Sequence, residues 1–393
     1  MIRKTPIVAA ACSMHDALRA LVRSPGIESG LKFRAGLGVL LKTGFVHLSD
    51  SGISSFYAIL ESLKTLSSRQ EVVLPAYTAG SLAVAVKKAG LRPVLCDISL
   101  KDFNADLKSL REAMNEKTLA VLAVHMFGIP VSDMDSFRAD MPEGAFLIED
   151  CCQAMGSRIK DEPVGSSGDA CFFSFNRGKN LPATNGGCIV IRNSSLEEPL
   201  RLALRGFHSS SQLECLRAFL KTALFIAGTD PYVYGMCHSL AHGFRETAPP
   251  TDFPIRSLGN FQSSLGLRCL RKADALFMAR YRNGMALLKG LSGAAGLLLP
   301  EIQAHILPVF NRMPVLFENE KNTRKVQERL WTRGIESSCM YVRPLHHMFD
   351  LGYGRDMFPN ACFLAERLLT LPVHPAIRNI DIDIMVDTIR GLL

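Results

Sequence analysis

The chain has 393 residues, of which 48% are hydrophobic and 21% are charged, and its formal net charge is +8. This length and apolar content can build a core in each of two domains, which excludes an intrinsically disordered protein. Lysines and arginines are scattered and no nucleic-acid-binding module is recognisable, so the charge favours an enzyme of small anionic molecules over a nucleic-acid binder.

The eleven cysteines do not point to a metal or a disulfide framework. None forms a CxxC pair, and Cys151 and Cys152 are adjacent, a spacing that zinc sites seldom use. We therefore expect no metal site, and reduced, mostly buried thiols in a cytoplasmic protein. Arg3 and Lys4 precede only a short apolar run, so we predict no signal peptide.

Short apolar or β-branched segments alternate with helix-length segments in the first half of the chain. We expect strands at residues 72–74, 93–97, 119–124, 145–149, 170–175 and 188–191. Such alternation predicts an α/β fold with a mostly parallel sheet flanked by helices, because parallel neighbours need crossover connections. Ligands of such sheets gather at the carboxyl ends of the strands.

The alternation breaks near residue 206, where a serine run and a proline-rich stretch surround a helical pattern. The chain is therefore expected to divide into a large domain at 1–205, a connector at 206–258, and a linking helix with a small α+β domain at 259–393. In the last part a long helix is expected from about 258 to 288, strands at 313–317 and 369–372, and a helix at 318–333.

Residues 213–228 of the connector have an amphipathic helical pattern. Charged residues occupy one face and large apolar residues cover much of the rest, namely Glu214, Arg217 and Lys221, and Leu216, Phe219, Leu220, Leu224 and Phe225. No segment of the sequence reaches the length of a membrane span. A packed amphipathic helix explains the pattern, and peripheral contact with a membrane surface or a lipid-linked substrate is the alternative.

Asp150 ends the apolar segment Phe146-Leu-Ile-Glu-Asp150. A buried carboxylate needs a partner, because an unpaired charge is costly away from water. A cationic ring nitrogen would supply one. The alternative is that Asp150 caps a helix that begins at Cys151.

Lys179 follows the apolar strand and loop Phe172-Phe-Ser-Phe-Asn-Arg-Gly-Lys179. A lysine in such a position is commonly a solvated loop residue. The order of these polar residues along the chain is more informative than any one of them. Asp150 and Gln153 follow one expected strand, Ser174 and Lys179 follow the next, and two glycines come after them.

Several blocks in this order resemble the DegT/DnrJ/EryC1/StrS family of pyridoxal-phosphate (PLP) dependent sugar aminotransferases, of the fold-type I class. The resemblance runs from about residue 46 to the C-terminus. Its blocks are Ser51-Gly-Ile-Ser-Ser55, Pro75-Ala-Tyr77, Gly90-Leu-Arg-Pro-Val-Leu-Cys-Asp97, Val124-His-Met-Phe-Gly128, Glu149-Asp-Cys-Cys-Gln-Ala154, Ser174-Phe-Asn-Arg-Gly-Lys179 and Asn185-Gly-Gly187.

The resemblance implies PLP as the cofactor and gives three residues their roles. Lys179 would form the Schiff base with the cofactor and shuttle the proton. Asp150 would keep the pyridine nitrogen protonated, and Gln153 would reach the hydroxyl side of the ring.

It also implies how the rest of the cofactor is held. Tyr77 would stack on the ring. The phosphate would rest on the N–H groups of Gly52, Ile53 and Ser54 at a helix N-terminus, with the Ser174 hydroxyl as a further donor. Asn260 would reach the phosphate bound by the other subunit of a homodimer with shared active sites.

The expected reaction moves an amino group from an amino-acid donor, with glutamate as the expected one, to a keto group of a nucleotide-linked sugar. Arg343, His346 and His347 lie where family members place substrate-facing loops, although they could equally be plain surface residues. The alternatives are a PLP-dependent sugar dehydratase, whose relatives carry His at the lysine position, and a non-catalytic sensory or binding protein on the same fold.

Overall fold

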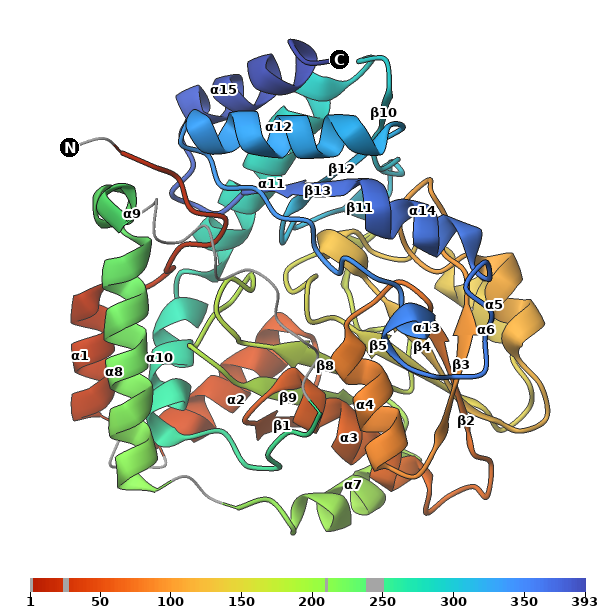
Figure 1. The fold of residues 1–393 in the computed structure, drawn as a ribbon. Coiled ribbons are helices and arrows are strands. Elements are labelled where there is room, and N and C mark those ends of the chain that lie inside the picture. The colour runs from red at the N-terminus through yellow and green to blue at the C-terminus, as the bar shows by residue number, and fades with distance from the viewer. Residues whose placement is uncertain (1–2, 24–27, 209–210, 238–250) are drawn as a thin grey trace.

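A computed structural model describes residues 3–23, 28–208, 211–237 and 251–393 of the chain (Figure 1). Within these residues the centre is a seven-stranded sheet in the order β1-β9-β8-β5-β4-β2-β3. The strands are β1 (Val46–Ser49), β2 (Glu71–Pro75), β3 (Arg92–Cys96), β4 (Thr118–Val124), β5 (Phe146–Asp150), β8 (Ala170–Ser174) and β9 (Gly187–Ile191). All six strands expected in the first half are confirmed, and β1 is an addition.

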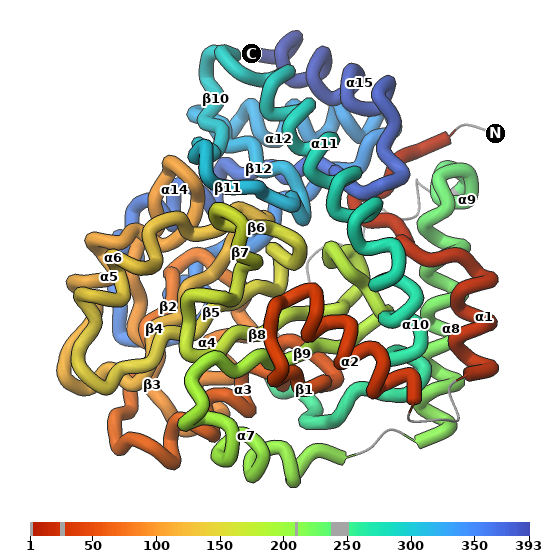
Figure 2. The backbone as a smooth tube through the Cα atoms, turned by 180° about the vertical axis from the view of Figure 1, so that it is seen from behind, coloured from red at the N-terminus to blue at the C-terminus, as the bar shows by residue number. Residues whose placement is uncertain are grey.

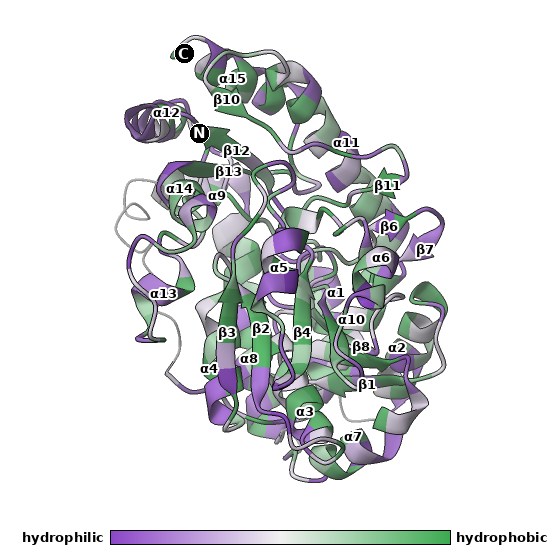
Figure 3. Cartoon of the chain, turned by 90° about the vertical axis from the view of Figure 1, so that its right-hand side faces the viewer, coloured by the Kyte–Doolittle hydropathy of each residue, from purple (hydrophilic) through white to green (hydrophobic). Residues whose placement is uncertain are grey.

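The sheet is mostly parallel, as predicted. Strands β3, β2, β4, β5 and β8 pair in parallel, whereas β9 runs antiparallel between β8 and β1. Every residue of β2, β4 and β9 is buried, because both faces of the sheet are covered (Figure 3). The pairs Val124↔Asp150 and Asp150↔Phe172 place the carboxyl ends of β4, β5 and β8 at one edge.

Alternate residues of the strands pack against helices on opposite faces. Val72 and Leu74 belong to a core with α3 (Gly52–Leu63) and α4 (Gly80–Lys88). Val73 and Val121 instead pack with α5 (Leu107–Ala113) and α6 (Met134–Ala139). Towards the β9 edge, Phe173 and Val190 share a core with α2 (Glu28–Leu40).

The C-terminal part has its own antiparallel sheet of β10 (Leu297–Leu298), β12 (Met313–Phe317) and β13 (Leu368–Leu371). The helices α12 (Glu320–Thr332) and α15 (Asn379–Arg390) share its core. The strands and the helix expected here are therefore confirmed. A third, small sheet joins β6 (Arg158–Ile159), β7 (Glu162–Pro163) and β11 (Ile306–Leu307).

The single long helix expected from about 258 to 288 is wrong. The chain instead forms α10 (Asn260–Leu270) and α11 (Ala273–Leu291), and Lys272 between them leaves helical geometry. The Lys272 ammonium lies 2.8 Å from the Asp16 carboxylate in α1 (Met14–Val22). The break lets α10 pack on α1 and α2 while α11 runs to the C-terminal sheet.

The N-terminal residues lie against the C-terminal part of the chain, beside α15 (Figure 2). Thr5 forms a β-bridge with Ile335, and the Arg3 guanidinium lies 2.9 Å from the Asp381 carboxylate. The division at 205 and 258 stays a prediction. Residues 209–210 and 238–250 of the predicted connector lie outside the described residues.

The amphipathic segment forms α8 (Gln212–Thr229), which packs beside α1 and α10. Phe219 faces inward, with its ring centroid 6.0 Å from that of Phe261. Leu216, Leu220 and Leu224 are exposed. Among the described residues no helix is long and apolar enough to cross a membrane, and peripheral membrane contact through 213–228 stays a prediction.

Candidate active site

A cavity of about 270 Å³ lies at the carboxyl ends of β5 and β8, beside the N-terminus of α3. This is the sheet edge where ligands of parallel sheets bind. Its walls come from both halves of the chain, namely Ser51, Gly52, Ile53, Thr78, Ala79, Ser81, Leu82, Asp150, Cys152, Gln153, Phe172, Ser174, Asn176, Lys179, Asn185, Gly186 and Tyr341. Larger hollows elsewhere on the described surface contain none of the residues that the sequence singled out as catalytic.

Asp150 ends β5 and presents its carboxylate to this cavity. The Cys152 N–H donates to Asp150 Oδ1 at 2.9 Å, a contact within the local turn that follows the strand. Burial raises the pKa of Asp150, and the Cys152 N–H and the Lys179 ammonium partly oppose that rise. A cationic ligand group beside Asp150 would favour its ionised form.

Lys179 lies in the loop after β8 and also lines the cavity. Burial lowers its pKa, while Cys152 and Asp150 oppose that effect and the nearby Arg312 and Arg280 add to it. A larger fraction of Lys179 is therefore a neutral amine at a given pH than for an exposed lysine. The expectation of a solvated loop lysine does not hold, because the loop folds into the molecule.

Three buried polar side chains hold the Lys179 loop. Asn180 Nδ2 donates to the carbonyl oxygens of Gln153 at 3.2 Å and Val309 at 2.8 Å. Asn311 Nδ2 donates to the Gly178 carbonyl at 2.9 Å. Residues on either side of Lys179 are thus tied to the segment that follows β5 and to the segment that leads into β12.

Arg280 of α11 is the third of these side chains. It is only 3% exposed, and its guanidinium donates to the carbonyl oxygens of Gly178 and Lys179, both at 3.3 Å, and of Asn311 at 3.0 Å. No carboxylate pairs with it among the described residues, and burial lowers its pKa to about 10. Backbone carbonyls therefore take the place of a counter-ion.

The N-terminus of α3 forms another wall. Ser51 caps the helix, because its Oγ accepts from the Ser54 N–H at 3.2 Å. The Ser54 N–H is thus already bonded, and the Ser54 side chain is buried outside the cavity lining. Gly52 and Ile53 line the cavity, so they are the residues of the predicted phosphate cradle that the structure brings together.

Close backbone contacts hold this helix terminus against the sheet. A Cβ on Gly187 would lie 2.6 Å from the Ser51 carbonyl carbon and oxygen. A Cβ on Gly52 would lie 2.7 Å from Cys152 Sγ and 3.2 Å from Ser174 Cβ. Glycine at both positions therefore lets α3 begin directly beside the ends of β8 and β5.

Gln153 reaches the cavity as expected, with a partner that the sequence did not reveal. Its Oε1 accepts from the Phe127 N–H at 3.1 Å, and its Nε2 lies 3.4 Å from the Tyr341 hydroxyl. Tyr341 comes from the loop between α12 and α13 (Leu345–Met348), almost two hundred residues away. Burial raises the pKa of Tyr341, and the nearby Asp150 charge adds to that rise.

Tyr77 is not brought to the cavity. Its side chain is fully buried, and its hydroxyl donates to the Met340 carbonyl. Thr78 and Ala79 line the cavity at this point, and the Tyr77 ring contacts Tyr341 edge-on with centroids 5.7 Å apart. The aromatic residues that line the cavity are therefore Tyr341 and Phe172, and Tyr77 packs against Tyr341 from outside the cavity.

Of the remaining predicted site residues, one lines the cavity and the others lie outside it. Ser174 lines the cavity. Asn260 is the first residue of α10 and does not line the cavity of its own chain. Arg343 is exposed, and His346 and His347 in α13 lie outside the cavity lining.

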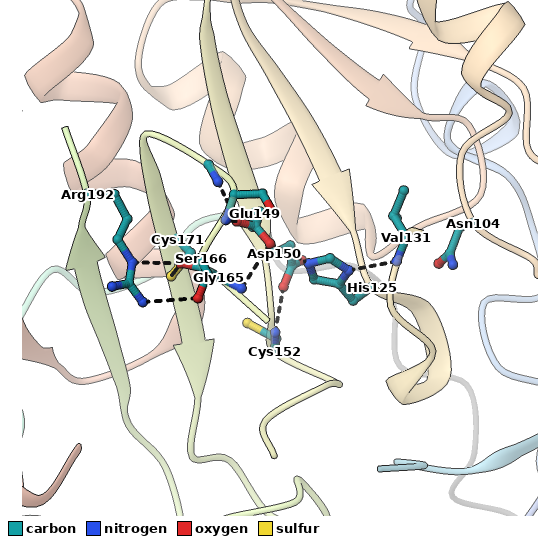
Figure 4. Close-up of polar contacts among 12 residues, drawn as sticks. Asn104, His125, Val131, Glu149, Asp150, Cys152, Gly165, Ser166, Cys171 and Arg192 are labelled. Carbon is teal, nitrogen blue, oxygen red and sulfur yellow. Dashed lines mark hydrogen bonds and ion pairs between the residues drawn. The ribbon is translucent and has the colours of Figure 1, made fainter. Parts of the chain in front are cut away.

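A buried hydrogen-bond network lies behind Asp150 (Figure 4). Glu149 Oε2 lies 2.9 Å from His125 Nε2, and the N–H groups of Gly165, Ser167 and Gly168 donate to the same carboxylate. The Val131 N–H donates to His125 Nδ1, which places the ring proton on Nε2. Burial raises the pKa of Glu149, but His125 and these amides outweigh it and hold the pKa below its ordinary value.

Comparison with known proteins gives the same family throughout. The model of the DegT/DnrJ/EryC1/StrS aminotransferase family matches residues 28–390. A UDP-N-acetyl-3-dehydro-alpha-D-glucosamine 3-aminotransferase of Acidithiobacillus ferrooxidans is 28% identical over 87% of this chain and 83% of its own length. A dTDP-4-dehydro-2,6-dideoxy-D-glucose 3-dehydratase of Saccharopolyspora spinosa is 25% identical over 87% of this chain and 75% of its own.

The fold agrees with these matches. The crystal structure of sugar aminotransferase CalS13 from Micromonospora echinospora covers 98% of this chain and 99% of its own, with a TM-score of 0.80 and 21% identity. The predicted fold-type I architecture is thereby confirmed.

Replacing Glu149 with Gln should lower the free energy of unfolding by about 3–5 kcal/mol, because His125 and three buried N–H groups lose their carboxylate. Chemical denaturation at neutral pH measures this change. In the folded chain the pKa of Glu149 is lowered, so its stabilisation is complete at neutral pH and is lost as the pH falls through that lowered pKa. The Glu149→Gln variant should therefore lose less stability on acidification than the native chain. The exposed Asp135→Asn is the control, and an equal effect of both substitutions would contradict the role of the network.

Proposed function

Because the chain belongs to the DegT/DnrJ/EryC1/StrS aminotransferase family, we propose that it transfers an amino group from an amino acid to the keto group of a nucleotide-linked sugar, with Lys179 as the cofactor-binding residue. It is a PLP-dependent aminotransferase by family. The observation that carries the assignment of Lys179 is a half-buried amine and a buried carboxylate, Asp150, in the wall of one cavity.

The groups around the cavity fit pyridoxal phosphate. The cofactor has a basic ring nitrogen, an aldehyde and a phosphate. Asp150 is a carboxylate suited to the protonated ring nitrogen, and Lys179 is an amine suited to the aldehyde. The N–H groups of Gly52 and Ile53 at the start of α3, with the Ser174 hydroxyl, suit the phosphate.

When bound, the cofactor supplies an electron sink that stabilises negative charge on the substrate carbon. Asp150 stays ionised next to a cationic ring nitrogen and so holds the proton on that nitrogen. The lowered pKa of Lys179 favours the neutral amine, which can act as a nucleophile and as a base. Lys179 Nζ would take the proton from the α-carbon of the amino-acid donor, and would give a proton to the keto carbon of the acceptor as that carbon gains the amino group.

The proposed substrate classes are inferred from the names of similar proteins. The aminotransferase of Acidithiobacillus ferrooxidans carries a UDP-linked sugar in its name, and the dehydratase of Saccharopolyspora spinosa a dTDP-linked one. A nucleotide-linked ketosugar is therefore the acceptor class to test first. Glutamate is the donor to test first. A lipid-linked acceptor would suit the exposed leucines of α8.

A sugar dehydratase is the second candidate function, because one relative bears that name. Lys179 argues against it, since dehydratases that resemble this family carry His at the corresponding position. A sensory or binding role would not need the Lys179 amine to be reactive. Covalent attachment of the cofactor to Lys179 separates an enzyme from such a scaffold, and amino transfer in a product assay separates it from a dehydratase.

Lys179→Ala should abolish amino transfer, with a fall in rate of about 10⁴-fold or more, because no other group can move the proton. Borohydride treatment of the native protein should fix the cofactor to Lys179, as peptide mass analysis would detect. The variant should keep its circular-dichroism spectrum and lose this attachment. Lys108→Ala, in exposed α5, is the control. Retained transfer in Lys179→Ala would overturn the assignment.

Arg280→Gln should displace the Lys179 loop without removing the lysine. We expect kcat to fall by about 10- to 100-fold, with a smaller change in KM for the donor, because catalysis depends on placing the amine closely. Attachment of the cofactor to Lys179 should also slow, which stopped-flow absorbance measures. Arg282→Gln lies on the exposed side of the same helix and should have no effect. If both variants attach the cofactor as fast as the native chain, Arg280 does not position the loop.

The shared active site of the proposed homodimer gives a separate test. Asn260 lies outside the cavity of its own chain, at the N-terminus of α10, which suits contact with a second subunit. Asn260→Ala should weaken cofactor binding. Mixing this variant with Lys179→Ala should then restore activity, because one site of the mixed dimer has both residues intact. If mixed dimers form and stay inactive at limiting PLP, Asn260 does not act across the interface.

A further inference from the structure

Two histidines and a cysteine converge on one carbonyl oxygen outside the catalytic cavity. His346 and His347 belong to α13, and Cys362 belongs to α14 (Pro359–Arg367). The carbonyl oxygen of Arg355, in the loop between these helices, lies 3.3 Å from His346 Nε2 and 2.9 Å from His347 Nε2. Cys362 Sγ lies 3.7 Å from His346 Nε2, 3.9 Å from His347 Nε2 and 3.8 Å from the Arg355 oxygen.

These separations suit the corners of a tetrahedral metal site. Zinc binds imidazole nitrogen at about 2.0–2.1 Å and thiolate sulfur at about 2.3 Å, which makes the edges of the tetrahedron about 3.3–3.7 Å long. The three ligand atoms of His346, His347 and Cys362 all lie within 4.8 Å of one another. His347 and Cys362 are partly exposed, whereas His346 is 8% exposed, so solvent reaches the cluster from one side.

We propose that His346 Nε2, His347 Nε2 and Cys362 Sγ bind one divalent cation of the zinc type, with the Arg355 carbonyl oxygen or a water molecule in the fourth position. Two imidazoles and a thiolate form a donor set that favours zinc over the harder cations magnesium and calcium. On binding, a sulfur–metal bond replaces the S–H bond of Cys362, and the thiol proton passes to solvent. No electron is transferred.

Hydrogen bonding accounts less well for the arrangement. Both imidazoles would have to donate to the single Arg355 oxygen, and the contacts to Cys362 Sγ would be weak ones. A cation at the centre would account for the contacts among the two imidazoles, the thiol and the Arg355 oxygen, and the 3.6 Å hydrogen bond from Cys362 Sγ to the Met357 carbonyl would be given up when the thiol loses its proton.

A buried group of one histidine, one glutamate and one cysteine gives a useful contrast. His125, Glu149 and Cys151 also lie close together. There His125 Nδ1 accepts from the Val131 N–H, and Glu149 accepts from three backbone N–H groups. Because these hydrogen bonds already use the ligand atoms, we propose no metal there.

The proposed cation would have a structural effect on the active site. The Leu345 N–H donates to the Ala76 carbonyl at 2.8 Å, which ties α13 to the end of β2. Tyr341, four residues before Leu345, lines the catalytic cavity. Joining α13 to α14 through a metal would therefore fix the segment that presents the Tyr341 ring.

The experiment measures metal on the PLP-bound, full-length protein. After incubation with zinc and removal of the excess, the native protein should hold about one equivalent by elemental analysis. Cobalt(II) should give the intense d–d absorption of a tetrahedral site and a sulfur-to-cobalt charge-transfer band. Cys362→Ser should lose the charge-transfer band and bind zinc at least about tenfold more weakly in a chelator competition.

The controls separate this site from other thiols and from misfolding. Cys339→Ser changes a partly buried thiol outside the cluster and should keep both the zinc and the cobalt spectrum. His347→Gln changes a partly exposed ligand and provides a second test if Cys362→Ser does not fold. The proposal is overturned if the native protein binds no zinc beyond that held by Cys362→Ser or His347→Gln, or if Cys339→Ser loses as much as they do.

Discussion

The backbone hydrogen bonds around the Lys179 loop are the constraint on which the rest of the site depends. This loop follows β8 and has no helix or strand to fix it, yet its amine must stay in a buried cavity beside a carboxylate. Arg280 and Asn311 donate to the carbonyl groups of this loop, and Asn180, a residue of the loop itself, donates to the Val309 carbonyl. Two of these residues belong to the C-terminal half of the chain. The cavity thus exists only when that half is docked on the central sheet, because buried carbonyls without donors would be costly.

Two adjacent carboxylates at the end of β5 are both buried, yet their pKa values shift in opposite directions. Glu149 points to one side of the sheet, where His125 and three N–H groups stabilise its charge and lower its pKa. Asp150 points to the cavity, has a local N–H donor, and has a raised pKa. The difference in pKa follows from the number of donors rather than from depth, since both groups are buried. Glu149 therefore stabilises the end of the strand. The charged form of Asp150 has fewer hydrogen-bond donors, so a cationic group of a ligand would stabilise it.

The sequence predicted those parts of the molecule that follow from local pattern. The strands at 119–124 and 313–317 are continuous apolar runs, and the structure has them within a residue of the expected positions. The break at Lys272 was missed, because it depends on where α10 and α11 pack rather than on a proline or glycine. Lys179, Asp150 and Gln153 were predicted from their distinctive order along the chain, and all three line one cavity. Tyr341 and Arg280 were not predicted, since only the folded chain brings Tyr341 to the cavity and Arg280 to the backbone of the Lys179 loop.

Tyr77 illustrates why order along the chain can identify a segment and still misplace a side chain. The segment after β2 does reach the cavity, but through Thr78 and Ala79. In the strand and the turn that follows it, successive side chains take different directions, so an error of one or two positions turns a ligand contact into a core contact. The buried Tyr77 still affects the cavity, because its ring packs against Tyr341 and its hydroxyl binds the Met340 carbonyl. The loop that carries Tyr341 is thus held from the sheet side by Tyr77 and through α13 by the Leu345–Ala76 hydrogen bond. Two independent attachments of one loop restrict the orientation of the Tyr341 ring, and with it the shape that the cavity presents to an acceptor.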